Sequence, residues 1–290
     1  MQKKTWISGT LLLLATSCGL RAEDFFFDSA GVRVHYVVEG KGEPVVLIHG
    51  FAVDIASNWA EPGIIKGLAD RYQVIAIDNR GHGRSDKPHD PQQYGVNMVS
   101  DVTRLLDHLN IQKAHIVGYS MGGNIAGVFL TDHHERVRTA ILGATPWVGA
   151  DGLPARVVWA NQLAESLEQG RGIGPHIIRL TPRDERPPSA EQVEAISNMV
   201  LLRNDALALA AVMRGNARLF ASEAKLRANQ LPVLAIVGER DPVKTEVDNL
   251  VGALGNVKLV VIPGANHMSA FGRPEFLVAL KTFLGAHGNR

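Results

Sequence analysis

The chain has one cysteine, Cys18, and no excess of charge of either sign, with 30 Lys and Arg residues against 29 Asp and Glu residues. A single cysteine cannot form a disulfide within the chain. The balanced charge creates no field that would attract nucleic acid, so we expect no nucleic-acid partner. The histidines are scattered, with no closely spaced pair near a third metal ligand. We therefore expect no metal site, and no other cofactor is required.

Long apolar runs are also scarce, and the one near the N-terminus, from Trp6 to about Ala15, is too short to span a bilayer permanently. Lys3 and Lys4 precede this run, which is the pattern of a secretory signal. We expect the signal to cover residues 1–22. Its removal takes away three basic residues and no acidic one, which changes the formal net charge from +1 to −2.

The segment that ends the predicted signal leaves two alternatives open. Residues 14–17 read Leu-Ala-Thr-Ser and precede Cys18, which resembles the lipobox of bacterial lipoproteins, although Ala15 stands where leucine is commonest. Either Cys18 carries a lipid anchor, or it is discarded with the signal. In both cases we expect an exported protein of the bacterial periplasm or the medium, whose contact with a membrane is limited to that anchor. The sequence carries no signature of an oligomeric state.

Short, nearly continuous apolar runs predict strands that are buried on both faces. These runs are 32–38, 45–48, 73–77, 114–117, 137–142, 233–237 and 258–261. The turn-forming residues 39–44 predict a hairpin between the first two strands. Helical patterns lie between the later runs, at 64–71, 98–109, 124–133, 247–254 and 275–287. This alternation predicts an α/β fold with a mostly parallel central sheet and helices on both faces.

The alternation stops between residues 147 and 229, where the helical patterns 156–167 and 190–203 follow each other without a buried strand. We therefore expect a helical cap over 147–229, inserted into a core of residues 23–146 and 230–290. The arginines of the cap are interpreted as a solvated face, because glutamates balance them. These glutamates are Glu165, Glu168, Glu185, Glu191, Glu194 and Glu223.

Residues 118–123 read Gly-Tyr-Ser-Met-Gly-Gly and connect a predicted strand to a predicted helix. This context is that of a nucleophile elbow, a turn so sharp that its glycines must lack side chains. The turn projects the Ser120 hydroxyl above the end of the strand. The sequence thus predicts that Ser120 is a catalytic nucleophile, rather than a solvated serine in a glycine-rich turn.

A serine hydroxyl needs a nearby base, and the base needs a carboxylate to orient it. Asp241 follows the strand 233–237, and His267 follows the strand 258–261, so both lie beyond strand ends in the required chain order. We therefore predict a triad of Ser120, Asp241 and His267. Glu239 and Asp151 are the alternatives for the acid. Asp241 is preferred because it falls in the turn just beyond its strand and has a short side chain.

Reaction at a carbonyl also requires donors for the developing oxyanion, usually two backbone N–H groups. Met121 directly follows the nucleophile and supplies the first. Phe51 is expected to supply the second, since it lies in the loop after the strand 45–48. His49, in the same loop, is interpreted as a structural residue that fixes the turn.

Several motifs together resemble the α/β-hydrolase superfamily: His49-Gly50, the segment 78–85 with the sequence DNRGHGRS, the elbow, and the two late loops. The resemblance extends from about residue 32 to 287. The short elbow and the ordinary HG loop are similar to those of bacterial carboxylesterases. The resemblance also implies that the segment 78–85 is a structural loop near the site, with arginines that brace the fold.

The residues that this chain lacks exclude several of the activities found in the superfamily. Dehalogenases and epoxide hydrolases of this superfamily use an aspartate as nucleophile, where this chain has Ser120. Epoxide hydrolases also use tyrosines of the cap, and none of the four tyrosines lies there. The loop 49–53 lacks the glycine- and proline-containing extension of proline iminopeptidases. We therefore expect hydrolysis of a small carboxylic ester through an acyl-enzyme. Lactone hydrolysis, carbon-carbon bond hydrolysis and perhydrolysis use the same triad, and a non-catalytic binder is the less favoured alternative.

The cap is expected to cover a substrate pocket lined by Trp147, Val148, Trp159 and Leu163, with Tyr119 as a further candidate contact. The alternative for the two tryptophans is packing of the cap onto the core, because a large aromatic side chain at such a junction buries much area in either role.

Overall fold

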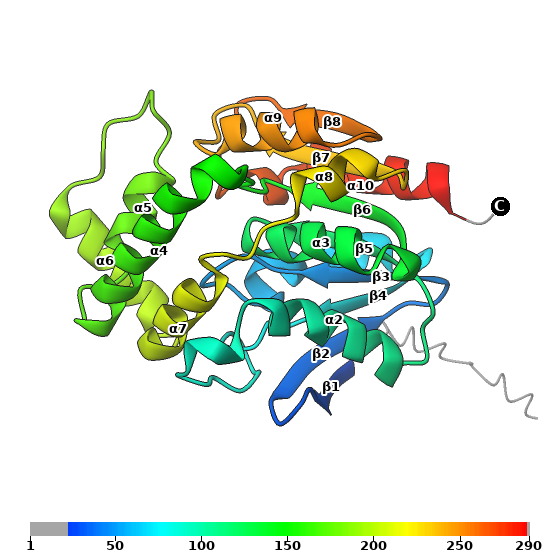
Figure 1. Ribbon diagram of the computed structural model, residues 1–290, viewed down its shortest axis with the longest axis horizontal. Coiled ribbons are helices and arrows are strands. Elements are labelled where there is room, and N and C mark those ends of the chain that lie inside the picture. The colour runs from blue at the N-terminus through cyan, green and yellow to red at the C-terminus, as the bar shows by residue number, and fades with distance from the viewer. Residues whose placement is uncertain (1–22, 289–290) are drawn as a thin grey trace, which may run out of the picture.

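A computed structural model describes residues 23–288, which form an eight-stranded sheet with the order β1-β2-β4-β3-β5-β6-β7-β8 (Figure 1). The predicted signal and Cys18 lie outside the described residues. The strands are β1 Glu23–Asp28, β2 Arg33–Glu39, β3 Glu43–Ile48, β4 Tyr72–Ile77, β5 Ala114–Tyr119, β6 Val137–Gly143, β7 Val233–Gly238 and β8 Val257–Ile262. The six strands β3 to β8 run parallel, and β1 and β2 are antiparallel to their neighbours. The mostly parallel sheet is confirmed, and β1 is an additional strand.

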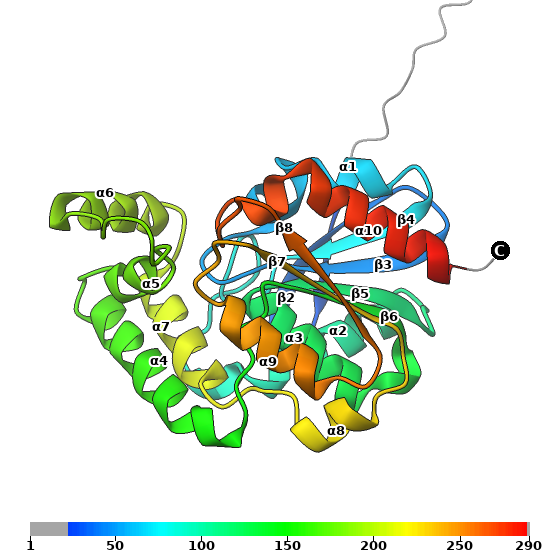
Figure 2. The ribbon, with the colours of Figure 1, turned by 90° about the horizontal axis from the view of Figure 1, so that it is seen from above.

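Helices cover both faces of the sheet, as predicted (Figure 2). On one face lie α1 Ile64–Leu68 and α10 Pro274–His287, and on the other lie α2 Val96–His108, α3 Met121–Asp132, α8 Glu223–Ala228 and α9 Lys244–Ala253. Strand β3 shows why two helical layers are needed. Its Val46 and Ile48 belong to one hydrophobic core, while Val45 and Leu47 belong to the core on the opposite face. A strand that is apolar on both faces is stable only when both are covered.

The hairpin predicted between the first two segments is wrong. β2 pairs with β1 and β4, whereas β3 lies between β4 and β5. The intervening turn crosses the start of β4, and Gly40 there has a φ of 78°. A Cβ atom at this glycine would collide with the carbonyl oxygens of Ala69 and Tyr72. The turn therefore carries the chain past β4, so that the fully apolar β3 occupies the centre of the sheet.

Four helices between β6 and β7 form a group at one end of the sheet, on the left in Figure 1. They are α4 Leu153–Glu168, α5 Gly174–Arg179, α6 Ala190–Leu201 and α7 Ala206–Asn216, and we call them the helical insertion. Helices α4 and α7 bury apolar side chains against each other, including Leu163 and Leu209. The last helix of the predicted segment, α8, instead lies beside α9 of the core.

Within residues 23–288, no single helix has both the length and the apolar character needed to cross a membrane. The pair α6 and α7 passes that test only when the two are taken together, across a bend of 96°.

Candidate active site

Ser120 stands in the sharp turn between β5 and α3, with φ of 54° and ψ of −113°. A non-glycine residue with positive φ is costly, and such strain concentrates at functional sites. The turn closes tightly, because a Cβ atom at Gly118 would collide with the carbonyl oxygen of Gly122, and one at Gly122 would collide with that of Ile48. The Ser120 N–H donates to the carbonyl oxygen of Gly143 at 2.8 Å, which fixes the turn against β6. The geometry is that of the predicted elbow.

The structure brings the three predicted triad residues together. His267 Nε2 lies 3.0 Å from Ser120 Oγ, and His267 Nδ1 lies 2.9 Å from Asp241 Oδ2. Asp241 and His267 are both buried, so the ion-like pair they form during a reaction is shielded from water. Asp241 Oδ1 also accepts the backbone N–H of Val243 at 3.0 Å, which fixes the carboxylate. The arrangement allows His267 to take a proton from Ser120 while Asp241 holds its ring.

The other two candidate acids do not contact His267. Glu239 Oε2 accepts the backbone N–H of Gly264 at 2.8 Å, so this carboxylate ties the loop after β7 to the loop after β8. Asp151 is exposed, in a short turn before α4. The preference for Asp241 thus agrees with the geometry, and the role that Glu239 has is to hold two loops of the site together.

Tyr119 fixes the loop that carries His267. It is buried, and its hydroxyl donates to the carbonyl oxygen of His267 at 2.6 Å. Burial raises the pKa of the Tyr119 phenol well above its ordinary value, with the nearby charge of Asp241 as a further cause, so the phenol remains a donor. The hydroxyl is therefore engaged in positioning the His267 loop, while Tyr119, a predicted substrate contact, also lies in the wall of a cavity beside Ser120.

The loop after β3 lies against the elbow. Its Gly50 approaches Ser120 closely, and the Gly50 N–H donates to Asn58 Oδ1 at 2.9 Å. Among residues 23–288, the backbone N–H groups of Phe51 and Met121 have no hydrogen-bond partner, and both residues line cavities beside Ser120. Two free donors next to the nucleophile are suited to an oxyanion. His49 is buried and accepts the N–H of Asn79 at 2.9 Å, which is a structural role.

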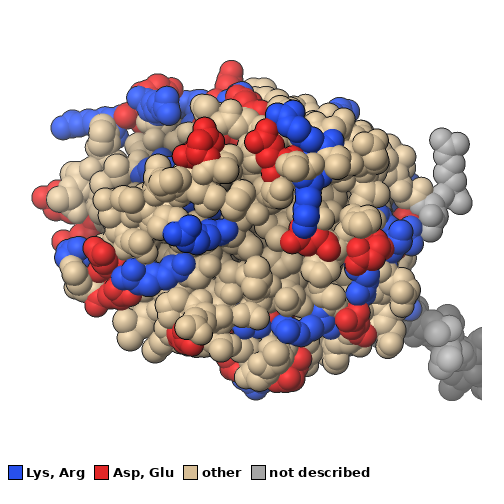
Figure 3. All heavy atoms as spheres, in the orientation of Figure 1, with Lys and Arg blue, Asp and Glu red and all other residues tan. Residues whose placement is uncertain are grey.

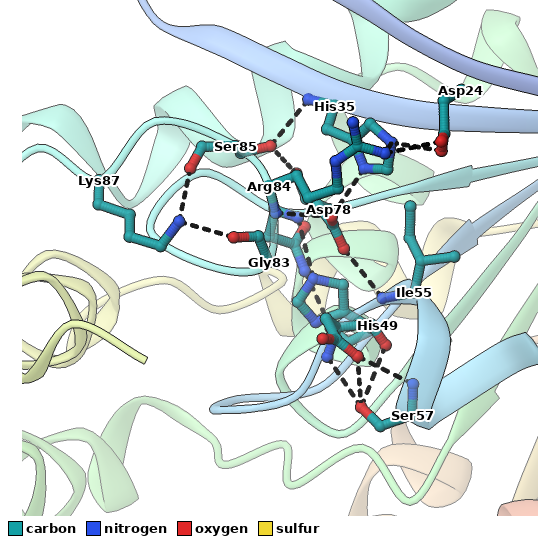
Figure 4. Close-up of polar contacts among 12 residues, drawn as sticks. Asp24, His35, His49, Ile55, Ser57, Asp78, Gly83, Arg84, Ser85 and Lys87 are labelled. Carbon is teal, nitrogen blue, oxygen red and sulfur yellow. Dashed lines mark hydrogen bonds and ion pairs between the residues drawn. The ribbon is translucent and has the colours of Figure 1, made fainter. Parts of the chain in front are cut away.

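A buried polar network supports this loop from the opposite side (Figure 4). Asp78 follows β4 and accepts hydrogen bonds from His35 Nδ1 at 2.7 Å and from the backbone N–H groups of Ile55 and Arg84, each at 2.9 Å. Burial acts to raise the pKa of Asp78, but the hydrogen bonds from His35 and the two backbone groups outweigh it and lower the pKa. The carboxylate thus links β2, the oxyanion-side loop and the segment 78–85.

An Asp78→Asn substitution is expected to lower the free energy of unfolding at pH 7 by about 3 kcal/mol, because hydrogen bonds to a buried charge are lost. A carboxyl whose pKa is depressed in the fold stabilises it above the unfolded pKa of about 3.9, and that contribution disappears as the pH falls through the folded value. The difference between variant and wild type should therefore shrink below about pH 4. Urea unfolding at pH 7 and pH 3.5 measures it, with the exposed Asp70→Asn as control. A difference that does not depend on pH would contradict this account.

The arginines of the segment 78–85 also brace the fold. Arg80 is buried and donates to both carboxylate oxygens of Asp101 on α2, at 2.7 and 2.6 Å. Arg84 pairs with Asp24 of β1 at 2.7 Å, near the surface. Neither arginine lines the cavities beside Ser120.

Two cavities meet at Ser120 and His267, and both are roofed by the helical insertion. The first has a volume of about 300 Å³ and extends between α3, α4, α5 and α7, with Trp159, Arg156 and Asn124 in its wall. The second has a volume of about 430 Å³ and extends below α5 and α6, with mostly apolar walls. A substrate whose scissile bond lies at Ser120 can therefore place one part in each cavity.

Only two of the four residues predicted to line the pocket do so. Val148 and Trp159 lie in the wall of the first cavity. Trp147 lies outside both cavities; it is buried, and its Nε1 donates to the carbonyl oxygen of Ala221 at 2.9 Å. Leu163 is also fully buried, on the face of α4 that meets the other helices. Trp147 thus follows the packing alternative stated for the tryptophans, and Leu163 packs within the insertion where a cavity contact was expected.

His176 and Arg156 both line the first cavity, although neither was predicted from the sequence as a site residue. Burial lowers the pKa of His176 to about 3, with the charges of His267 and Arg179 as further causes, so its ring is neutral near pH 7. Arg156 was assigned to a solvated face, but its Nη1 atom is fully buried. Helical periodicity could have placed Arg156 on the buried face of α4. It precedes the buried Ala160 and Leu163 by one and two helical turns and so shares their face.

Charges of both signs are interspersed on the face seen in Figure 3. Among residues 23–288, no group of three or more His, Cys, Asp or Glu side chains is placed to hold a metal ion.

Comparison with known proteins places these residues in a family. A family model described as alpha/beta hydrolase fold matches residues 43–207. The chain is 38% identical over 118 residues to the soluble epoxide hydrolase of Corynebacterium sp., covering 40% of each chain. It is 28% identical over 263 residues to a putative non-heme chloroperoxidase of Synechocystis sp., covering 83% of this chain and 90% of the relative. A thermophilic esterase from Thermogutta terrifontis superposes with a TM-score of 0.71 at 25% identity, covering 93% of this chain and 100% of that one. The matches to the first curated relatives span only 30% to 40% of the relatives' lengths.

Proposed function

Because the chain belongs to the α/β-hydrolase fold family, we propose that it is a hydrolase that cleaves carboxylic esters through an acyl-enzyme formed on Ser120. The observation that carries this proposal is the position of His267. One ring nitrogen lies 3.0 Å from Ser120 Oγ and the other 2.9 Å from Asp241 Oδ2, which is the geometry that a nucleophilic serine requires.

In the proposed reaction, Ser120 Oγ attacks the ester carbonyl carbon and its proton passes to His267 Nε2. The carbonyl electron pair moves to the oxygen, where the N–H groups of Phe51 and Met121 stabilise the negative charge. Collapse of this intermediate breaks the bond to the alcohol oxygen, which receives the proton from His267. Water then attacks the acyl-enzyme, again giving a proton to His267, and the acid and the Ser120 hydroxyl are released.

Two features argue against the activity named for the Corynebacterium relative. The nucleophile position holds Ser120, whereas the superfamily's epoxide hydrolases use an aspartate there. The four tyrosines lie in or near the core, at positions 36, 72, 94 and 119, so none is available in the helical insertion to hold an epoxide oxygen. The esterase from Thermogutta terrifontis, which is similar over nearly the whole chain, supports the ester reaction.

The same triad could hydrolyse lactones or carbon-carbon bonds next to a carbonyl. It could also carry out perhydrolysis, in which hydrogen peroxide replaces water. A panel of p-nitrophenyl esters of graded acyl length, tested beside lactones, separates these substrates. A fluorophosphonate probe tests the nucleophile directly, since it labels only an activated serine. Labelling at Ser120 together with ester turnover supports the proposal, whereas an unlabelled protein would indicate a binding function of the same fold.

We expect Trp159→Ala to change the relative kcat/KM for short and long acyl esters by about tenfold, because the substitution enlarges the first cavity. Trp159 lies in its wall, with the Arg179 guanidinium 4.9 Å from its ring centre. The pH dependence should not change, since it reports mainly His267. Trp147→Phe is the matched control: it lies outside both cavities and should lose thermal stability with an unchanged acyl-length profile. The same outcome for Trp159→Ala would assign that tryptophan to packing.

A further inference from the structure

The first cavity contains buried polar atoms that nothing in residues 23–288 satisfies. Four residues of its wall each have one: Asn124 Oδ1, Arg156 Nη1, Trp159 Nε1 and His176 Nδ1. Buried polar groups in folded proteins almost always have a hydrogen-bond partner, since leaving one unpaired is costly. All four side chains belong to the wall of one cavity next to the proposed nucleophile. The atoms themselves are closed to solvent in the free protein, so a polar group of a ligand would pair with them only after the side chains turn toward the cavity.

Arg156 differs from the neighbouring arginines of the insertion because it has no counter-charge. Arg179 pairs with Glu246 at 2.9 Å, and Arg214 pairs with Glu168 at 2.7 Å. Among the described residues, no carboxylate lies within ion-pair distance of Arg156, and its only hydrogen bond is a long one, 3.4 Å, from Nη2 to the carbonyl oxygen of Asn216. An unpaired, desolvated guanidinium is unfavourable in the free protein and favours binding of an anion.

The protonation states of Arg156 and His176 leave the wall of the first cavity with one net positive charge. Burial lowers the pKa of Arg156 to about 10, with the charge of Arg179 as a second cause, so the guanidinium is still protonated near pH 7. The His176 ring is neutral at that pH, because its pKa is lowered to about 3. Glu246 lines the same cavity and compensates Arg179.

We propose that Arg156 binds a carboxylate carried by the substrate, so that the enzyme prefers esters with a free acid group on the part that enters the first cavity. This inference rests on the proposed ester hydrolysis at Ser120. A guanidinium matches the planar carboxylate, and a monoanion matches its single charge. A phosphate dianion would exceed that charge, in a cavity that Glu246 also lines. The volume of about 300 Å³ limits this part of the substrate to a small acid.

The second cavity is suited to the uncharged part of such a substrate. Apolar side chains from α5, α6 and the loop after His267 form much of its wall, among them Ile177, Val200 and Phe271. Glu185 and Arg186 also line the second cavity, but both are exposed, whereas Nη1 of Arg156 in the first cavity is buried. The buried guanidinium would therefore orient an asymmetric ester with its charged end under α4.

Matched pairs of esters test the preference, one pair for each side of the scissile bond. Monoethyl glutarate is compared with ethyl pentanoate, and 4-acetoxybutanoate with butyl acetate. We expect the wild type to favour the anionic member of one pair by at least about tenfold in kcat/KM. Arg156→Met should reduce that ratio by about 10- to 100-fold, as expected for loss of a charge-assisted hydrogen bond. Arg156→Lys should retain part of the preference.

Arg218→Met is the control for charge removal, because Arg218 is exposed, unpaired among the described residues and outside both cavities. It should keep the wild-type ratio. An unchanged ratio in Arg156→Met, or a wild type that favours neither member of either pair, would overturn the inference. Thermal unfolding checks that each variant is folded, and Arg156→Gln serves if the methionine variant is not.

A binding measurement separates this inference from the proposed function. Calorimetry of glutarate with the wild-type protein and with Arg156→Met requires no turnover. Binding that is lost in the variant supports the carboxylate site even if no ester is cleaved and Ser120 is not labelled, which would contradict only the esterase proposal. Conversely, turnover of neutral esters with no glutarate binding and no anionic preference contradicts only the carboxylate site.

Discussion

A Ser120→Ala variant is expected to remain folded and to lose at least about four orders of magnitude in kcat, because removal of a nucleophile from a triad leaves only the contributions of binding and oxyanion stabilisation. The fold should survive for a structural reason. The Ser120 side chain faces the cavities and bonds only to His267, while the turn is held by the Ser120 N–H donation to Gly143, which alanine preserves.

The measurement is ester turnover by purified protein whose circular dichroism and thermal unfolding match those of the wild type. Ser100→Ala is a suitable control, since Ser100 lies on α2 and its hydroxyl donates only to the carbonyl oxygen of Val96. It should keep wild-type kcat. A Ser120→Ala protein that retained a tenth of the wild-type rate would show that the nucleophile has been assigned wrongly.

Much of the core could be predicted because its strands are buried on both faces and therefore read as continuous apolar runs between turn residues. The elbow could be predicted for a different reason. The backbone approaches positions 118 and 122 so closely that both must be glycine, and these glycines leave a recognisable trace in the sequence. Ser120, Asp241 and His267 meet because β5, β7 and β8 run parallel, so that their carboxyl ends lie at one edge of the sheet.

The partners of strands and helices could not be predicted in the same way. The hairpin expected at residues 39–44 does not form, because the position of β3 is decided by contacts with β4 and β5, which lie far along the chain. The strand β1 has acidic ends and was not recognised, and its register with β2 is set by pairing rather than by its own composition. Local patterns carry little information about such long-range choices.

The wall of the substrate cavities was the least predictable part. Trp147 and Trp159 are both aromatic residues at the start of the insertion, yet one is buried beneath it and the other lines a cavity. Arg156 belongs to a segment with balanced charge, and only its phase relative to Ala160 and Leu163 places it on the buried face of α4. Composition therefore misassigned a residue that helical periodicity would have placed correctly.

Asp241→Asn should lower kcat by about four orders of magnitude, nearly as much as loss of the nucleophile, while leaving the fold intact. Asp241 accepts the Nδ1–H of His267 at 2.9 Å, which leaves Nε2 free to take the proton of Ser120. An asparagine amide would donate to Nδ1 and favour the tautomer with hydrogen on Nε2. That tautomer cannot accept the serine proton, so the loss should appear in kcat rather than in KM.

Glu239→Gln is the matched control, because Glu239 lies two residues earlier in the same loop and carries the same charge. Its side chain accepts the Gly264 N–H and has no contact with His267, so we expect less than a tenfold change in kcat. The exposed Asp151→Asn should have no effect on kcat. The ranking of the three variants decides the assignment. Small and equal losses in Asp241→Asn and Glu239→Gln, with a large loss in Asp151→Asn, would mean that the acid reaches His267 from the segment before α4 rather than from the loop after β7.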